Sequence, residues 1–326
     1  MPANLPPQYF EAEKRFREAK TQPEKIAALE AMLAIMPHHK GTDKLRASLR
    51  RRLSKLRDEQ ERRKGGGRAD LYSVKREGAG QVALVGTPNA GKSQLLAALT
   101  NAEPVVADYP FTTQRPQAGM VAFENVQIQL VDLPPLIEEH TEPWVFNIMR
   151  SADALLLVLD LIQDPLAELE ITLKVLQGQR IILMGGEEGD VEPGAFTKRS
   201  LVVGNKGDLA GAGENFAILK EFYGEKVTMT IISAKEGLNL EQLRGQLYTL
   251  LDVLRIYPKR PGHEPDLSAP VILKQGSTVL NLAREIHKDF ITNLRYARIW
   301  GSGKFDGQRV QRDYILQDGD IIELHI

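Results

Sequence analysis

GTPNAGKS, at residues 86–93, is the stretch that decides the fold of this chain. The apolar run QVALV precedes it directly, and LLAALT, which has a helical composition, follows. A strand, a glycine-rich loop and a helix start form a phosphate-binding loop, whose backbone N–H groups surround the phosphates of a nucleotide. A glycine-rich turn before a helix can serve packing alone, but the complete GxxxxGKS spacing in this context favours a nucleotide site.

Two side chains of this loop are expected to carry its chemistry. Lys92 reaches the β- and γ-phosphates as a point charge, and Ser93 offers its hydroxyl to Mg²⁺. The residues expected to contact the nucleotide along the loop are Gly86, Asn89, Ala90, Gly91, Lys92, Ser93 and Gln94.

Length and composition place the chain among multidomain globular proteins. With 326 residues, 42% of them hydrophobic, it can form two or three domains with cores of their own. A net charge of -1 gives no overall attraction to nucleic acid or membranes, and the absence of cysteine excludes disulfides and thiolate chemistry. No targeting signal and no membrane-length apolar run is present, so we expect a cytoplasmic protein without a membrane partner.

Apolar strands alternate with helical stretches after residue 80, which predicts a mostly parallel sheet with helices on both faces. We expect strands at 81–86, 126–133, 154–161, 180–185, 200–206 and 227–234. The predicted fold is therefore an α/β P-loop domain at 69–258, preceded by a basic helical region at 1–68 and followed by a small α+β domain at 269–326.

Two of the predicted strands end in residues that select a base. NKGD, at 205–208, follows one strand, and SAK, at 233–235, follows the next. A carboxylate at a strand end can accept two hydrogen bonds from the paired N–H donors of guanine, which adenine lacks. The pattern predicts a guanine site formed by Asn205, Lys206, Asp208, Ser233, Ala234 and Lys235.

The first 64 residues are expected to form three helices, at 10–19, 22–36 and 44–63. In the third, leucines repeat at helical spacing among many lysines and arginines. This basic face is either a solvated surface or an arm that contacts RNA phosphates. GGGR, at 65–68, is expected to be a hinge.

The C-terminal stretch has a pattern of its own. A strand at 271–276, a helix at 278–288 and strands at 295–301 and 321–326 predict a small β-grasp. Its basic residues either form an RNA-facing patch beside three aromatic side chains, or the aromatic side chains form the core instead. The basic residues are Arg295, Arg298, Lys304, Arg309 and Arg312, and the aromatic residues are Tyr296, Trp300 and Phe305.

The ordered motifs GTPNAGKS, DYPFTT, DLPP, NKGD and SAK resemble those of translation-factor-class GTPases, and DYPFTT resembles the Obg and DRG branch. FREAKTQPEK is similar to the N-terminal region of DRG proteins, and LRIYPKRPGHEPDLSAPVIL resembles their junction into a C-terminal TGS domain. Between Asp132 and Asn205 the chain has no room for the inserted domain of DRG proteins. The resemblance implies a Mg²⁺-dependent GTPase with GTP and GDP as ligands.

The resemblance also implies roles for single residues. Asp132 would hold the water shell of Mg²⁺, and Thr113, favoured over Thr112, would close over the metal and the γ-phosphate. Catalysis would rest on Lys92, Thr113 and Asn89. Asn89 matches an asparagine that ligates a stimulating K⁺ ion in several GTPases, although an asparagine in a tight loop often serves only the turn.

One segment departs from the family pattern. Related GTPases have DxxG, whose glycine N–H senses the γ-phosphate, but this chain has Pro135 in place of the glycine, and proline has no N–H. Leu136 follows where many GTPases carry a glutamine that orients water. We therefore predict weak coupling between the γ-phosphate and this segment.

These features leave two functions open. One is a GTPase that hydrolyses GTP slowly and acts on ribosomes or structured RNA, with an activating or stabilising protein partner. The other is a guanine-nucleotide-binding interaction module with little or no turnover. Use of ATP is a third hypothesis, which Asp208 opposes.

Overall fold

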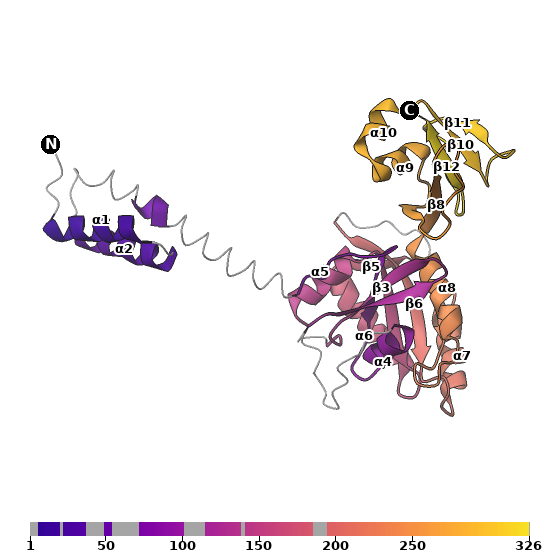
Figure 1. Ribbon diagram of the computed structural model, residues 1–326. Coiled ribbons are helices and arrows are strands. Elements are labelled where there is room, and N and C mark those ends of the chain that lie inside the picture. The colour runs from indigo at the N-terminus through magenta and orange to yellow at the C-terminus, as the bar shows by residue number, and fades with distance from the viewer. Residues whose placement is uncertain are drawn as a thin grey trace. The chain divides into compact units, whose positions relative to one another are not determined.

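The computed structural model describes residues 6–19, 22–36, 49–53, 72–100, 115–137, 141–184 and 194–325. The chain divides into two compact units, Met1–Ser73 and Val74–Ile326, which are coloured along the chain in Figure 1. Within the described ranges, no helix is both long and apolar enough to cross a bilayer.

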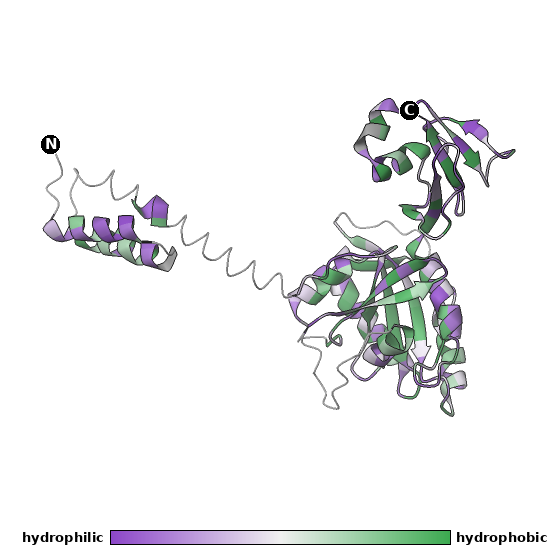
Figure 2. Cartoon of the chain, viewed as in Figure 1, coloured by the Kyte–Doolittle hydropathy of each residue, from purple (hydrophilic) through white to green (hydrophobic). Residues whose placement is uncertain are grey.

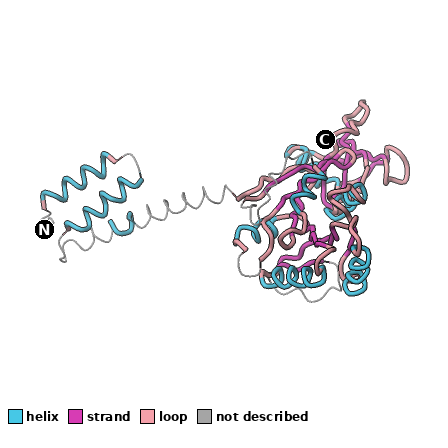
Figure 3. The backbone as a smooth tube through the Cα atoms, turned by 90° about the horizontal axis from the view of Figure 1, so that it is seen from below, coloured by secondary structure: helices cyan, strands magenta, loops and turns pink. Residues whose placement is uncertain are grey.

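The first unit contains a helical hairpin. The first two predicted helices are present as α1 (Pro7–Glu18) and α2 (Gln22–Ile35), which lie side by side (Figures 1 and 3). Tyr9 of α1 and Leu29 of α2 are buried in its core together with Leu49. The predicted third helix lies mostly outside the described residues, but 49–53 is helical and exposes three arginines there, at 50–52.

The second unit begins with a seven-stranded sheet. Its strands are β1 (Gln81–Val85), β2 (Gln117–Phe123), β3 (Val126–Asp132), β4 (Ala154–Asp160), β5 (Ile181–Met184), β6 (Phe196–Asn205) and β7 (Thr228–Ile231). The order is β2-β3-β1-β4-β6-β5, and β7 also pairs with β6. Among these described strands, β2 is antiparallel to its neighbour and the other pairings are parallel. The six predicted strands are confirmed, and β2 was not predicted.

Helices cover both faces of this sheet, again as predicted. One core packs α5 (Pro143–Ser151), α6 (Pro165–Gly178) and α7 (Ala212–Tyr223) against the sheet. The other packs α4 (Lys92–Leu99) and α8 (Leu240–Leu251) against the opposite face. All seven residues of β4 are buried because the strand is covered on both sides, and the strands of this sheet are accordingly largely green in Figure 2.

A second, smaller sheet follows. Its strands are β8 (Val253–Lys259), β9 (Val271–Lys274), β10 (Tyr296–Trp300), β11 (Gln308–Val310) and β12 (Ile321–His325), in the order β11-β10-β12-β8-β9. Helix α9 (Val279–Ile286) packs on one face, with α10 (Lys288–Asn293) after it. The boundary expected at residue 258 would leave most of β8 in the first domain, but β8 belongs to this second sheet. β8 and β11 were not predicted. We therefore propose a domain boundary between α8 and β8.

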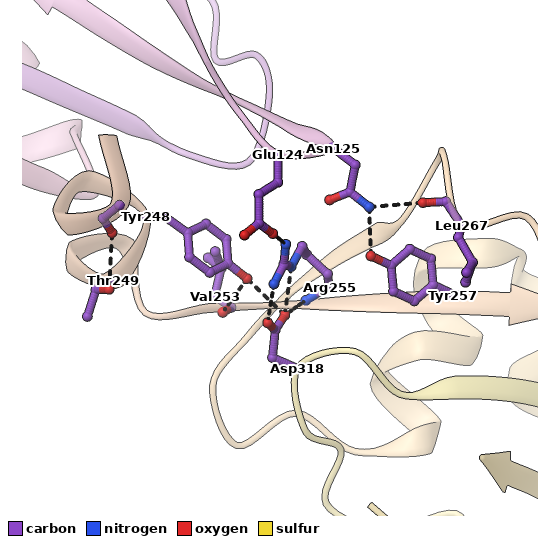
Figure 4. A network of polar contacts seen from close by, with 10 residues as sticks. Glu124, Asn125, Tyr248, Thr249, Val253, Arg255, Tyr257, Leu267 and Asp318 are labelled. Atoms are coloured by element: carbon purple, nitrogen blue, oxygen red, sulfur yellow. Dashed lines mark hydrogen bonds and ion pairs between the residues drawn. The ribbon is translucent and has the colours of Figure 1, made fainter. Parts of the chain in front are cut away.

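A polar network connects the two sheets of this unit (Figure 4). Arg255 of β8 pairs with Glu124, in the turn between β2 and β3, and with Asp318, from which its Nη2 atom lies 2.6 Å away. The hydroxyl of Tyr248, in α8, donates to Asp318 over 2.9 Å. Asn125, next to Glu124, donates to the hydroxyl of Tyr257 over 2.6 Å.

Candidate guanine-nucleotide site

The loop between β1 and α4 is shaped by two glycines. A Cβ atom on Gly86 would lie 2.3 Å from the carbonyl oxygen of Val158, in β4. Gly91 has a left-handed φ of 90°, and a Cβ atom there would lie 2.2 Å from Nδ2 of Asn205. Both positions therefore require glycine, and the loop reaches the N-terminus of α4 with its backbone close to β4 and β6.

Lys92, the first residue of α4, is held inside this loop. Its side chain is buried, and its Nζ atom donates to the carbonyl oxygens of Gly86 and Thr87 over 3.1 Å each. Burial lowers the pKa of Lys92 to about 8, although Asp132 and Glu168 act in the opposite direction. An ammonium in this position lies where the loop would hold phosphates.

Ser93 and Asp132 meet at the end of β3. The Ser93 hydroxyl donates to Oδ2 of Asp132 over 2.5 Å, while the other oxygen, Oδ1, is buried and has no hydrogen-bond partner in the described chain. Burial raises the pKa of Asp132, against the opposing effects of Ser93 and Lys92. A hydroxyl beside a carboxylate with an unpaired oxygen fits Mg²⁺, which prefers oxygen ligands and binds through one or two carboxylates together with phosphates. Thr113 and Thr112 lie outside the described residues.

Metal binding elsewhere has no support in the described ranges. They contain no group of three or more histidine or acidic side chains close enough to hold a metal ion. A Mg²⁺ ion at Ser93 and Asp132 would take its remaining ligands from water, from nucleotide phosphates and from Thr113, which lies outside the described residues.

Asn205, the last residue of β6, connects the phosphate-type loop to the predicted guanine loop. Its Nδ2 atom donates to the carbonyl oxygen of Ala90 over 2.9 Å, and its Oδ1 accepts from the N–H of Ala234 over 3.0 Å. The side chain is 1% exposed. The structure thus brings together three motifs that lie far apart in the sequence.

The rest of NKGD and SAK lies around Asn205. Asp208 is exposed, and the Ser233 hydroxyl lowers the pKa of its carboxyl group below its ordinary value. Ser233 and Ala234 are buried, whereas Lys235 is exposed and lies 3.5 Å from Glu236. An exposed carboxylate that stays ionised is suited to accept hydrogen bonds from a base at the surface of this loop.

Asp160 and Glu168 also lie beside the predicted guanine loop, although the sequence did not indicate them as site residues. Lys206 has a left-handed φ of 63°, and its Nζ atom lies 2.5 Å from Oδ2 of Asp160, the last residue of β4. Asp160 is 1% exposed, and its N–H donates to Oε2 of Glu168 over 3.0 Å. Burial raises the pKa of Glu168. The position of Asp160 at a strand end, like that of Asp132, was the one signal that could have found it.

The segment after Asp132 is anchored in the protein. The N–H of Leu136 donates to the carbonyl oxygen of Gly86 over 3.0 Å, and Leu133 and Leu136 are buried in the core beneath α5. The hydroxyl of Thr141 accepts from the N–H of Ile137 and donates to its carbonyl oxygen. These bonds fix the segment by contacts of its own, and its weak coupling to a γ-phosphate stays a prediction.

Two further loop residues are exposed. Asn89 has a left-handed φ of 64°, a conformation that asparagine adopts more readily than most residues. The backbone conformation of Asn89 is therefore consistent with a role in the turn. Its side-chain amide is exposed, so it could also contact a ligand. Gln94, in the first turn of α4, is exposed as well.

Comparison with known proteins identifies the family. A model described as a 50S ribosome-binding GTPase matches residues 81–185, and a TGS domain model matches residues 254–326. The chain is 33% identical to a GTP-binding protein of Methanocaldococcus jannaschii over 364 residues, covering 93% of this chain and 92% of the relative. It is 28% identical to developmentally-regulated GTP-binding protein (DRG) 1 of Xenopus laevis, covering 92% of this chain and 98% of the relative. The chain belongs to the DRG family.

Another relative of this DRG protein is ribosome-interacting GTPase 1 of Saccharomyces cerevisiae, which is 26% identical and covers 93% of this chain and 99% of the relative. The predicted P-loop GTPase fold and TGS domain are confirmed, and this DRG protein is a GTP-binding protein. Its alignment with the archaeal relative runs over 364 residues, more than its own 326, so it lacks residues that the relative carries within the matched region.

Proposed function

We propose that this DRG protein hydrolyses GTP slowly to GDP and phosphate in a Mg²⁺-dependent reaction, and that it acts on ribosomes or structured RNA in the cytoplasm. The observation that carries the proposal is the double hydrogen bond of Asn205 to Ala90 and Ala234. It places a phosphate-type loop and a guanine-type loop side by side in one site.

Each motif contributes one function to the proposed reaction. Asp208 accepts the two N–H donors of guanine, Lys206 packs along the base, and the N–H groups near Ala234 meet its carbonyl oxygen. The N-terminus of α4 and Lys92 hold the phosphates. Backbone contacts along residues 86–94 complete the binding surface.

The reacting phosphate would be positioned by few groups. Ser93, Asp132 and Thr113 would hold Mg²⁺, which when bound supplies positive charge to the β- and γ-phosphate oxygens. Water would attack the γ-phosphate in line with the departing GDP. The apolar, buried side chain of Leu136 cannot orient that water, and its N–H is already bonded to Gly86, so hydrolysis without an activator is slow.

The same observation at Leu136 favours a second candidate function. A GTP-binding module with little or no turnover needs the guanine and phosphate contacts but no water-positioning group. Single-turnover GTP hydrolysis, measured with and without ribosomes, separates the two functions. Phosphate release that disappears in Lys92→Ala but not in Lys220→Ala, an exposed lysine on α7, supports the GTPase, and no release under either condition supports the module.

Guanine selection has its own test. Asp208→Ala should weaken GTP binding strongly and leave the already weak binding of ATP unchanged. If both nucleotides respond equally, Asp208 does not read the base.

The proposed ribosomal or RNA partner rests on two supports. The yeast relative is named a ribosome-interacting GTPase, and the matching GTPase model is described as ribosome-binding. In this chain, Arg50, Arg51 and Arg52 are exposed on the helical stretch 49–53. Co-sedimentation with ribosomes should fall severalfold when these three residues are changed to glutamate, and unchanged co-sedimentation would remove the proposed role of this basic helix. If an activating or stabilising protein partner is added, the rate of single-turnover GTP hydrolysis should rise.

A further inference from the structure

One face of the TGS sheet is open, and its strand β10 places aromatic and basic side chains there. Ala297 and Ile299 point into the core that α9 covers, so the alternating residues Tyr296, Arg298 and Trp300 lie on the opposite face. The interpretation of Tyr296 and Trp300 as core residues is therefore wrong. Phe305, in the turn after β10, is 66% exposed and is not a core residue either.

Two arginines lie directly opposite each other on this face. Arg298 of β10 is the register partner of Arg309 in β11, and both side chains are exposed. Side chains paired in this way have Cβ atoms about 4.5–5.5 Å apart, and like charges at that spacing destabilise a sheet. No ion pair within the described ranges neutralises either guanidinium.

The carboxylate beside Arg298 on this face is engaged with other side chains. Glu323 of β12 lies opposite Arg298 on the other side of β10, but its Oε2 accepts from Nζ of Lys259 over 2.6 Å. Its Oε1 lies 2.7 Å from Nε2 of His325. Burial raises the pKa of Glu323, but Lys259 and His325 outweigh that effect and lower it, so the group stays ionised and paired.

Aromatic rings hold the surrounding cations in place. The Cζ atom of Arg309 lies 4.1 Å from the ring centroid of Tyr296, which in turn stacks on His325 with a centroid distance of 4.5 Å. Nζ of Lys259 lies 4.8 Å from the ring centroid of Trp300. Such contacts stabilise a cation without neutralising its charge, so Arg309 remains available to an anion.

We infer that Arg298 and Arg309 form a phosphate-binding site for RNA on the open face of the TGS sheet, an inference that rests on the proposed RNA partner. Two guanidinium groups at cross-strand spacing supply several parallel N–H donors, the geometry that suits phosphate oxygens. Bound phosphate would also remove the repulsion between the two arginines. The pair thus lowers the stability of the free sheet and favours its complex.

RNA suits this face better than an isolated anion because positive charge extends beyond the two arginines. Lys259 lies over Trp300 on this face, and Lys304, in the turn after β10, is exposed. A polymer with one phosphate per nucleotide can contact several cations at once. Arg312, which the sequence also placed in this patch, instead donates to the carbonyl oxygen of Leu294 and serves the fold.

The test uses the full chain and a fluorescein-labelled single-stranded RNA, with binding measured by anisotropy over a range of salt concentrations. The double variant Arg298→Ala/Arg309→Ala should bind about tenfold more weakly. The slope of log Kd against log salt should fall by about 1.4, because each arginine that binds a phosphate of a single strand contributes about 0.7 to that slope. Arg284→Ala, an exposed arginine on α9 outside this face, is the matched control and should bind normally.

Thermal unfolding distinguishes a binding role from a structural one. Arg298→Ala should unfold at the same or a higher temperature, because it removes a like-charge pair. The inference is overturned if the double variant binds RNA as tightly as the unaltered protein does, or if Arg284→Ala loses as much affinity as the double variant. It is also overturned if a polyglutamate peptide, added at the same total charge as the RNA, displaces the RNA. If the unaltered protein binds no RNA while GTP binding is intact, the proposed RNA partner itself fails, and with it this site.

Discussion

Leu136 donates its backbone N–H to the carbonyl oxygen of Gly86 over 3.0 Å. The segment that follows Asp132 is therefore hydrogen-bonded to the first residue of the phosphate loop, whose carbonyl oxygen also accepts from Lys92. The Leu136 side chain is 2% exposed and packs in the core that contains α5. In this DRG protein the segment is held by packing, and we predict that its position depends little on the nucleotide.

Leu136→Ala should lower the free energy of unfolding by about 2–5 kcal/mol, because it leaves a cavity in a packed core. Urea denaturation measures this change. Leu209→Ala, at a leucine that is 46% exposed, is the control and should change stability by less than about 0.5 kcal/mol. A destabilisation by Leu136→Ala that appears with bound GTP and not with bound GDP would contradict the anchored segment.

Asn89→Gly should separate the two roles of Asn89. Glycine adopts the left-handed φ of 64° without strain, so the turn is kept while the amide is lost. If Asn89 ligates K⁺, GTP turnover in KCl exceeds turnover in NaCl severalfold in the unaltered protein, and the difference disappears in Asn89→Gly. Equal rates in the two salts would remove K⁺ from the proposed mechanism, and a difference that survives in Asn89→Gly would remove Asn89 from the K⁺ site.

Asp160→Asn should weaken GTP and GDP binding equally, by about tenfold or 1.4 kcal/mol. The substitution keeps a side-chain oxygen for the N–H of Ile162 but removes the ion pair that fixes Lys206. Isothermal titration calorimetry with each nucleotide measures the effect. Asp164→Asn, at the N-cap of α6, removes a neighbouring carboxylate and should leave affinity unchanged. Loss of GTP binding alone would show that Asp160 acts at the γ-phosphate instead.

Asp318→Asn should reduce stability at neutral pH by about 1 kcal/mol or less, since the group is one-third exposed. Burial alone would raise the pKa of Asp318, but its bonds from Arg255 and Tyr248 lower it overall. An ordinary carboxyl group titrates near pH 4. Because the folded-state pKa is lower, the stabilisation is present above about pH 4 and is lost as the pH falls through the folded-state pKa.

The measurement for Asp318 is the unfolding free energy from urea titrations between pH 6 and pH 3. The gap between the unaltered protein and Asp318→Asn should narrow below about pH 4. Asp306→Asn, in an exposed turn, removes one carboxylate outside the network and serves as the control. A gap that stays constant with pH would mean that the network does not depend on the charge of Asp318.

The sequence predicted the parts of the fold that depend on local pattern. Strands covered on both faces, such as β4, read as continuous apolar runs and were found. β2 was missed because it is an edge strand with exposed and half-buried positions, so it lacks the continuous apolar run by which the other strands were found. β8 was not predicted, and the boundary expected at residue 258 left most of its residues in the GTPase domain, because its pairing with β12 joins residues more than sixty positions apart.

Some residues of the candidate site could likewise be predicted from local motifs, and others could not. The motifs at 86–93, 205–208 and 233–235 have fixed local spacing, and the structure brings them together through Asn205. Asp160 and Glu168 reach the site through the packing of β4 and α6, which no short motif encodes. Pro135 could be recognised from sequence as a lost N–H donor, but the bond of Leu136 to Gly86 required coordinates.

The contact between Gly91 and Asn205 also limits how this site can diverge. A Cβ atom on residue 91 would lie 2.2 Å from the Asn205 amide, and that amide lies 115 positions away from its acceptor, Ala90. Two segments that are distant in the chain therefore share one packing constraint. A descendant of this protein could exchange its nucleotide for another ligand only through coordinated changes in both segments, so substitutions at these positions should be inherited together.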